Sequence, residues 1–136
     1  MELFCSYDFH QAYHKLKKNN SYREIESLIL KHFFDKTPSE LCEGTLLNNR
    51  SEANPYIKKR LKGSGGFRVY YYLYFTDGKL FLLFVHPKSG SMGVPNIDDA
   101  FKAQIIKKLP EAIRNKEIFH LSKDKSGKKI IFIKQE

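Results

Sequence analysis

The sequence predicts an α+β fold, in which an antiparallel sheet carries an N-terminal helical hairpin on one face and is followed by a C-terminal helix. Three observations indicate this fold class. Two segments with the apolar spacing of amphipathic helices occupy about 8–36. Three strand-like runs, separated by turns that contain glycine, follow between 56 and 86. Another helical pattern begins near 98, and the 136 residues suit a single domain.

The N-terminal elements are predicted from capping signals. Residues 2–6 are a candidate first strand, and Asp8 is a candidate N-cap for the helix after it. Ser21 and Glu24 have the spacing of a capping box, so a second helix is expected to begin there. The two helices would form the hairpin over 8–36, with their apolar stripes facing the sheet.

The middle of the chain predicts a meander of three strands. Residues 37–55 are expected to form an irregular surface connection with a short strand at TLL. Strands are then expected at 56–62, 67–75 and 79–86. The second of these, FRVYYYLYF, is dense in β-branched and aromatic residues, and the Asp-Gly pair after it is a hairpin signal.

The C-terminal part predicts a helix and a further hairpin. The helix should start at Asn96 or Asp98, be kinked or restarted by Pro110, and end near Asn115. Residues 118–136 are expected to form two strands around a polar turn, as an additional C-terminal hairpin.

The charge of the chain indicates a polyanionic partner. The formal charge is +9, from 24 Lys and Arg against 15 Asp and Glu. Nucleic acid is the commonest partner of such a protein, an acidic protein the next and a membrane surface the third. A solvated basic surface without a specific partner is the alternative.

The cysteines and apolar runs indicate a reduced, cytoplasmic chain. Cys5 and Cys42 fit neither a disulfide framework nor a zinc site. The first residues, MELFCSYDFHQ, lack the basic start of a signal peptide, and no apolar run is long enough for a membrane span.

Basic residues concentrate on the predicted meander. Between Ala53 and Thr76 there are five basic residues and no acid. Because side chains alternate along a strand, one face of the first two strands should combine cations with tyrosines. The expected members of this face are Lys58, Arg60, Lys62, Arg68, Tyr70, Tyr72 and Tyr74. The opposite face of the second strand should pack on the helices through Phe67, Val69, Tyr71, Leu73 and Phe75.

This face suits single-stranded nucleic acid, since cations bind phosphates and aromatic rings stack on unpaired bases. His86 and Lys88, at the end of the third strand, share one parity and can reach the same area. The RNA contacts expected from the pattern are Lys59, Lys62, Tyr70 and Tyr72. An ordinary half-exposed sheet shows the same alternation of Lys and Tyr, so that interpretation stays open.

No metal or cofactor site is predicted. Four histidines lack a Cys or acid at metal-ligand spacing and are expected to be surface or helix-packing residues: His10, His14, His32 and His120. No arrangement of Ser, His and Asp or of Cys and His supports a hydrolase of those types.

The segment YIKKRLKGSGGFRVYYYLYFTDGKLFLLFVHPK resembles the RelE/HigB toxins of type II toxin–antitoxin systems. In that group a Lys/Arg strand leads to a glycine turn, a GG-aromatic-Arg-x-x-Tyr strand, an acidic-Gly hairpin and an aliphatic strand that ends in a basic residue. The match is clearest over 56–88 and looser over 1–55, and GSMGVPNIDDAFKAQIIKKLPEAI resembles the C-terminal helix of some longer members. The resemblance implies a RelE-like fold for a single domain of residues 1–136.

The resemblance also implies an activity: metal-independent cleavage of mRNA on the ribosome, by attack of a ribose 2′-hydroxyl on its own 3′-phosphate. Lys58 and Arg60 match the strand lysines that bind phosphate, and Lys58 is a candidate base if its pKa is lowered. Arg68 matches the arginine that stabilises the phosphorane. Lys88 matches the basic residue after the last strand, and His86 is a candidate acid or base.

One departure and two alternatives accompany this hypothesis. Many RelE-type members carry a tyrosine shortly after the last strand, and SGSMGVPNIDDAF has none, so Tyr70 or His86 would have to do its work. The alternatives are a ParE-like toxin that acts on DNA gyrase and a non-catalytic RNA-binding member of the fold. The expected partners are an acidic antitoxin protein, mRNA and the ribosome, and not a membrane.

Overall fold

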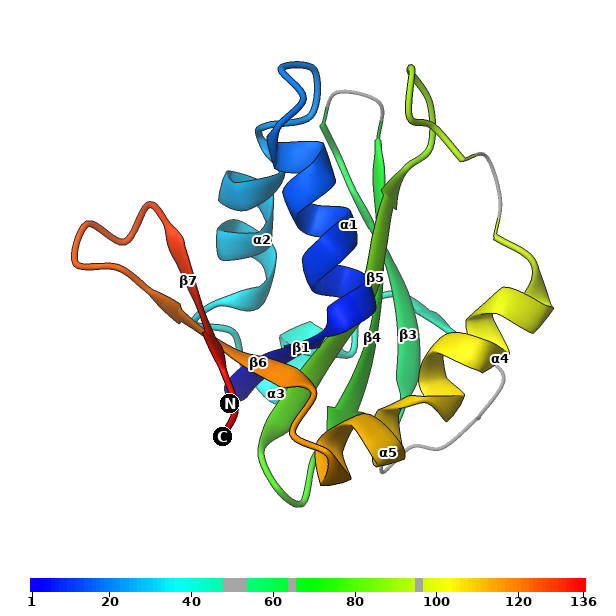
Figure 1. The fold of residues 1–136 in the computed structure, drawn as a ribbon, viewed down its shortest axis with the longest axis vertical. Helices are drawn as coiled ribbons and strands as arrows, with labels where there is room; N and C mark the ends of the chain where they lie inside the picture. Colours follow the sequence, from blue (N-terminus) through cyan, green and yellow to red (C-terminus); the bar gives the residue numbers. More distant parts are fainter. Residues whose placement is uncertain (48–53, 64–65, 95–96) are drawn as a thin grey trace.

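A computed structural model describes residues 1–47, 54–63, 66–94 and 97–136, and Figure 1 shows their arrangement. The strands are β1 (Glu2–Ser6), β2 (Thr45–Leu46), β3 (Tyr56–Leu61), β4 (Phe67–Tyr74), β5 (Lys79–Pro87), β6 (Ile118–Lys123) and β7 (Ile130–Lys134). The helices are α1 (Tyr7–Lys17), α2 (Ile25–Phe33), α3 (Pro38–Leu41), α4 (Asp99–Lys107) and α5 (Leu109–Arg114).

The strands form one sheet in the order β2-β3-β4-β5-β1-β6-β7. β1 runs parallel to β5, and every other neighbouring pair in this order is antiparallel. The predicted α+β class and the meander β3–β4–β5 are confirmed, and the sheet is mostly antiparallel as predicted, the exception being the parallel pairing of β1 with β5. The segment between β1 and β5 supplies the long crossover connection that a parallel pair requires.

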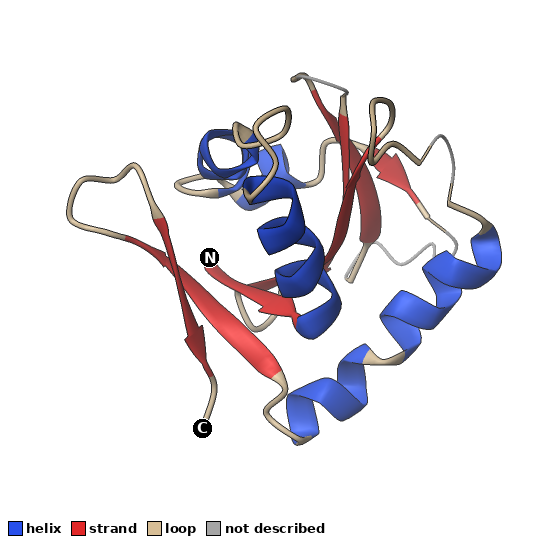
Figure 2. Cartoon of the chain, turned by 45° about the horizontal axis from the view of Figure 1, so that its top comes forward, coloured by secondary structure: helices blue, strands red, loops and turns tan. Residues whose placement is uncertain are grey.

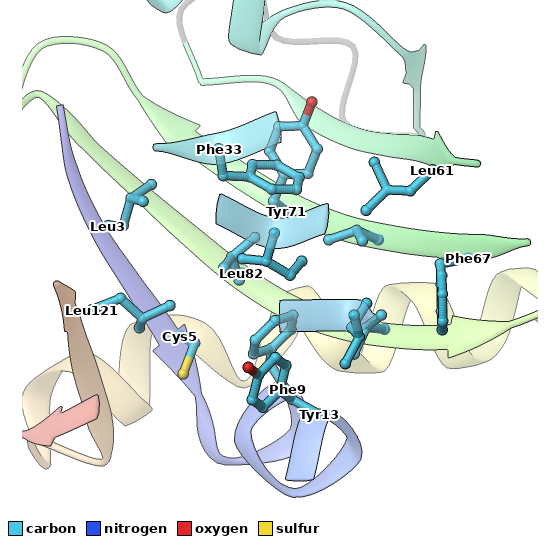
Figure 3. Close-up of a cluster of buried hydrophobic side chains, with 14 of the residues drawn as sticks. Leu3, Cys5, Phe9, Tyr13, Phe33, Leu61, Phe67, Tyr71, Leu82 and Leu121 are labelled. Atoms are coloured by element: carbon cyan, nitrogen blue, oxygen red, sulfur yellow. The ribbon is translucent and has the colours of Figure 1, made fainter. Parts of the chain in front are cut away.

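One face of the sheet packs on α1 and α2, as Figure 3 shows for the residues between them. The predicted apolar row of β4 lies in this core, with Phe67, Val69, Tyr71 and Leu73 buried. Phe33 of α2 places its ring edge-on to Tyr71, with the ring centroids 5.0 Å apart. α1 packs mainly on β5 and makes few contacts with α2, so the expected helical hairpin is not supported as a packing unit.

The other face of the sheet is covered in part by α4 and α5 (Figure 2). Tyr56, Tyr70 and Phe81 of the sheet are buried in one cluster with Ile105 of α4 and Leu109 of α5. The expectation that the tyrosine row faces an open side is therefore wrong over this area. The two helices are amphipathic, and the tyrosine rings supply the apolar surface that their inner side needs.

Two predicted helix starts are wrong. α1 is capped by Ser6, whose Oγ accepts a hydrogen bond from Phe9 N at 3.1 Å, and not by Asp8, which lies in the first turn. Ser21 does not cap α2, because turns separate the two helices and α2 begins at Ile25 without a side-chain cap. Sequence spacing alone does not show which of several neighbouring polar residues will be the N-cap, because this depends on where the preceding segment ends.

The helix after the meander is confirmed. Asp98 caps α4 by accepting a hydrogen bond from Phe101 N at 2.8 Å. The alternative start, Asn96, lies outside the described residues. Pro110 lies in the first turn of α5, where its missing N–H removes no helical hydrogen bond, so the chain restarts there as a second helix.

A short helix, α3, was not predicted, although its capping box is readable in the sequence TPSE. Thr37 Oγ1 accepts from Glu40 N at 3.2 Å, and Glu40 Oε1 accepts from Thr37 N at 3.1 Å. The short strand expected at TLL is present as β2. Within the described ranges, no helix has the length and apolar character needed to cross a bilayer.

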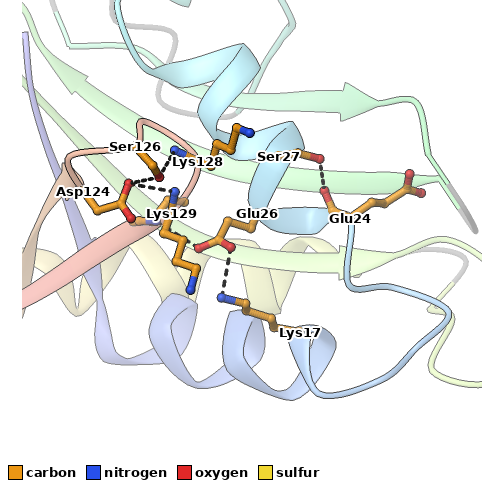
Figure 4. Close-up of polar contacts among 9 residues, drawn as sticks. Lys17, Glu24, Glu26, Ser27, Asp124, Ser126, Lys128 and Lys129 are labelled. Carbon is orange, nitrogen blue, oxygen red and sulfur yellow. Dashed lines mark hydrogen bonds and ion pairs between the residues drawn. The ribbon is translucent and has the colours of Figure 1, made fainter.

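The C-terminal hairpin belongs to the main sheet. β6 pairs with β1, and β7 pairs with β6, so 118–136 form the expected two strands. Glu26 of α2 holds the start of β7, since its carboxylate accepts a hydrogen bond from Ile130 N at 2.9 Å. The same carboxylate pairs with Lys17 of α1 at 3.0 Å (Figure 4). A single acid thereby connects α1, α2 and the hairpin.

Candidate functional site

The register of β3, β4 and β5 brings the predicted site residues into two adjacent rows. Arg68 of β4 lies opposite Arg60 of β3 on one side and opposite His86 of β5 on the other. In the next row, Lys58 of β3 lies opposite Tyr70 of β4. Neighbouring positions across an antiparallel pair are about 5 Å apart, so residues far apart in the chain converge on one face.

A register shift in β5 decides that His86 belongs to this face. The pairing slips between Tyr70 and Tyr71, and the extra residue lies on β5. As a result the consecutive residues Leu83 and Phe84 both join the cluster under α4 and α5. Without this bulge the alternation from Phe81 onward would turn His86 toward the opposite core.

These side chains line a small pocket of about 50 Å³. Its lining residues are Lys58, Arg60, Arg68, Tyr70, His86, Lys88, Ile97 and Lys102. Five of them are cationic and none is a carboxylate, so the pocket is suited to an anion. The volume is far below the about 300–1,000 Å³ of pockets for drug-sized ligands, and it suits a group as small as one phosphate.

Arg68 is the partly exposed cation at the centre of these rows. Its Nη1 donates to the carbonyl of Phe67 at 3.1 Å, and no ion pair with an acid is found for it among the described residues. The guanidinium therefore keeps most of its five donors for another acceptor. The turn before it is fixed by Gly66, whose φ is +63° and whose carbonyl accepts from Lys88 N at 2.6 Å.

His86 and Tyr70 form a buried hydrogen-bonded pair at this pocket. Tyr70 Oη and His86 Nε2 are 3.1 Å apart, and His86 Nδ1 lies 3.0 Å from the carbonyl of Pro87. Because a carbonyl only accepts, Nδ1 carries the proton toward Pro87, and a neutral ring then accepts from the Tyr70 hydroxyl through Nε2.

Burial lowers the pKa of His86, and the nearby charges of Arg68 and Lys58 lower it further, against the opposing hydrogen bond to Pro87. The imidazole is therefore neutral near pH 7. Burial raises the pKa of Tyr70, while Arg68 opposes that change, so its hydroxyl is protonated. The pair combines a proton donor with a free-base imidazole in one hydrogen-bonded chain.

Lys58 has the electrostatic setting expected of a candidate base. Partial burial lowers the pKa of its ammonium group, and four neighbouring cations lower it further: Lys102, Arg60, Arg68 and Lys88. Positive charges that repel one another in this way are stabilised together by a bound anion.

Lys102 of α4 is a pocket residue that the sequence did not reveal. Tyr56 Oη donates to its backbone carbonyl at 3.0 Å, which fixes α4 over β3. Its ammonium group lies 3.6 Å from the carboxylate of Asp99, which is 84% exposed. The FKAQIIKK pattern predicts the helix, but no signal in the sequence indicates where this helix crosses the sheet.

Of the four predicted RNA-contact residues, three do not line the pocket and the fourth, Tyr70, lines it as a buried side chain. Lys59 lies on the opposite side of β3, with its Nζ 5.8 Å from the ring centroid of Phe33. Lys62 is exposed just beyond the end of β3 and is not among the lining residues. Tyr70 lines the pocket but is only 2% exposed, so its ring is not a stacking platform. Tyr72 packs on the cluster beneath α4 and α5.

The gathered groups can hold an oxyanion among cations beside a neutral imidazole and a tyrosine hydroxyl. Across the described part of the chain, no group of three or more His, Cys, Asp or Glu side chains could hold a metal ion. Compared with known proteins, the chain matches no protein-family model and has no significant match among curated proteins.

Proposed function

We propose that this protein is an endoribonuclease of the RelE/HigB toxin type, which cleaves mRNA on the ribosome without a metal ion. The observation that carries the proposal is the pocket itself: five cations and no carboxylate surround the Tyr70–His86 pair. A phosphodiester fits this charge, and the pocket has room for the phosphate while the base and sugar stay outside.

The proposed reaction begins with the 2′-hydroxyl of the nucleotide whose 3′-phosphate occupies the pocket. Its proton moves to Tyr70 Oη while the Tyr70 proton moves to His86 Nε2, and the 2′-oxygen attacks phosphorus. Arg68, with Arg60 and Lys88, stabilises the extra negative charge of the phosphorane. The bond to the 5′-oxygen then breaks, and the Lys58 ammonium protonates the leaving oxygen. The products are a 2′,3′-cyclic phosphate and a 5′-hydroxyl.

This route assigns the roles that the resemblance left open. His86 is the final proton acceptor because it is neutral near pH 7 and has a lone pair on Nε2. Lys58 is assigned the acid role, because a lowered pKa makes its ammonium group a better proton donor. Tyr70 takes the place of the C-terminal tyrosine that this chain lacks.

A second candidate function, RNA binding without cleavage, is favoured by the burial of Tyr70 and His86. Tyr70 and His86 are 2% and 4% exposed and already hydrogen bonded to each other, an arrangement that would also support the surrounding cations without any proton transfer. RNA bound on translating ribosomes without new ends would support this alternative. Loss of supercoiling activity in a gyrase assay would instead support a ParE-like toxin.

Arg68→Ala is the variant that tests the proposal. Expression of the wild-type protein should slow growth and produce new mRNA ends in primer extension, and Arg68→Ala should reduce cleavage by about 100-fold or more. Arg23→Ala is the matched control, because Arg23 is an exposed arginine in the turn between α1 and α2. Unchanged cleavage in Arg68→Ala, or an equal loss in Arg23→Ala, would contradict the proposal.

The proposed partners follow from the exposed cations at the pocket rim, Arg60 and Lys88. An antitoxin with an acidic segment would neutralise them and block access to Arg68. The proposed place of action is the cytoplasm, where translating ribosomes are found.

A further inference from the structure

Two histidines on α1, away from the pocket, have converging rings. His10 and His14 are four residues apart, so they lie on the same side of the helix one turn apart. Their Nε2 atoms are 3.0 Å apart, and their ring centroids are 4.2 Å apart with an interplanar angle of 67°. Both side chains are partly exposed.

Residues from the C-terminal hairpin hold both rings in place. Phe119 of β6 stacks on His10 with centroids 4.0 Å apart and an interplanar angle of 8°. Phe132 of β7 contacts His10 at 5.2 Å and His14 at 5.1 Å between centroids. A hollow of about 280 Å³ beside His10 leads to solvent. The imidazole pair is therefore preorganised on a rigid helix, with access from outside.

We propose that His10 and His14 form a two-histidine site for a divalent transition-metal ion, with Ni²⁺ and Cu²⁺ preferred. Imidazole nitrogen suits these ions. With metal–nitrogen distances of about 2.1 Å, two Nε2 atoms 3.0 Å apart subtend an angle of about 90° at the metal. That angle belongs to the square-planar or octahedral coordination of Cu²⁺ and Ni²⁺, whereas a tetrahedral zinc ion needs its nitrogens about 3.4 Å apart.

The protonation states favour this role. Burial lowers the pKa of His10, and burial with the charges of His10, Lys17 and Lys18 lowers the pKa of His14, against the opposing charge of Glu26. Both rings are therefore neutral near pH 7, and without metal one Nε2–H donates to the other Nε2. Metal binding displaces that proton, which moves through solvent to Nδ1 of the same ring.

The remaining coordination positions belong to water or to a small ligand. No third His, Cys, Asp or Glu joins the two histidines anywhere in the described ranges. The site therefore binds a metal ion exchangeably, unlike a closed structural site with four protein ligands. The sequence did not predict the site, because a metal site was expected only where a histidine lies near a cysteine or an acid, and this pair has neither as a partner among the described residues.

Titration of the untagged full-length protein with NiCl₂, followed by calorimetry, tests the site. The wild type should bind one Ni²⁺ ion at this pair. His10→Gln and His14→Gln should each weaken that binding by about tenfold or more, because one imidazole loses the chelate advantage. His32→Gln is the matched control, since His32 is also a partly exposed helical histidine, and it should bind as the wild type does.

Nuclear magnetic resonance of the wild type gives a readout that does not depend on the variants folding. Paramagnetic Ni²⁺ should broaden the ring signals of His10 and His14 before those of His32 and His120. Equal broadening of all histidines, or unchanged Ni²⁺ affinity in folded His10→Gln and His14→Gln, would overturn the proposal. An equal loss of affinity in His32→Gln would overturn it as well.

Discussion

Tyr70 and His86 are the two residues of the site that form a buried hydrogen-bonded pair. The strand period correctly places Tyr70 on the face that carries Arg68, and the hydroxyl of Tyr70 lies 3.1 Å from His86 Nε2. The period does not tell whether another element covers that face, so the predicted role of Tyr70 as a stacking ring is wrong. The hydrogen bond from Tyr70 to His86 could be recognised only once the pairing of β4 with β5 was known.

Tyr70→Phe should destabilise the protein by about 1–3 kcal/mol, because it leaves the buried Nε2 of His86 without its hydrogen-bond donor. The free energy of unfolding in urea measures this loss. Tyr7→Phe is the control, since the Tyr7 side chain is exposed and its hydroxyl has access to water. Equal stability of Tyr70→Phe and the wild type would show that the pair does not hold the pocket together.

At the scale of elements, the meander β3–β4–β5 carries the site, and it was the part most fully predicted from the sequence. Dense β-branched and aromatic runs and an Asp-Gly turn define these strands locally. The bulge in β5 and the position of α4 were not predictable, because both depend on contacts between elements distant in sequence. Lys102 joins the pocket only because of the position of α4.

The glycine turn between β3 and β4 gives a prediction with a close control. Gly66 and Gly78 have φ values of +63° and +64°, so an alanine at either position should cost about 1 kcal/mol of stability. Gly66 lies two residues before Arg68, and its carbonyl accepts a hydrogen bond from Lys88 N, whereas Gly78 lies in the turn at the other end of β4. Backbone strain in Gly66→Ala should therefore also shift the pocket cations and reduce RNA cleavage in primer extension, and Gly78→Ala should not. Equal activity of the two variants would contradict the placement of Arg68.

In the whole molecule, the fold gathers five of the 24 Lys and Arg residues around one pocket on one face of the sheet, without a carboxylate in its lining. Composition predicts an anionic partner, and the strand period predicts most members of the pocket. Neither could show that Lys59 faces the helical core or that α4 and α5 cover the tyrosine row, since both follow from packing. The RelE-like assignment of the fold stays a prediction.

The cations around the pocket predict a salt-dependent affinity for single-stranded RNA. Each phosphate contact contributes about −0.7 to the slope of log K against log salt, so Lys102→Ala should make the slope less steep by about that amount. Filter binding between low and moderate salt measures the slope. Lys128→Ala, in the exposed turn between β6 and β7, is the control and should leave it unchanged. No difference between the two variants would place the RNA elsewhere on the surface.

The proposed reaction requires that a phosphodiester in the pocket be attacked by the adjacent 2′-hydroxyl. Ribosomes programmed with a synthetic mRNA test this requirement when the nucleotide 5′ to the cut carries a 2′-hydrogen in place of its 2′-hydroxyl. The unmodified mRNA should be cut to a 2′,3′-cyclic phosphate and a 5′-hydroxyl, and the 2′-deoxy mRNA should not be cut there. Cleavage of both mRNAs at the same rate, or products with a 5′-phosphate, would contradict the proposed reaction.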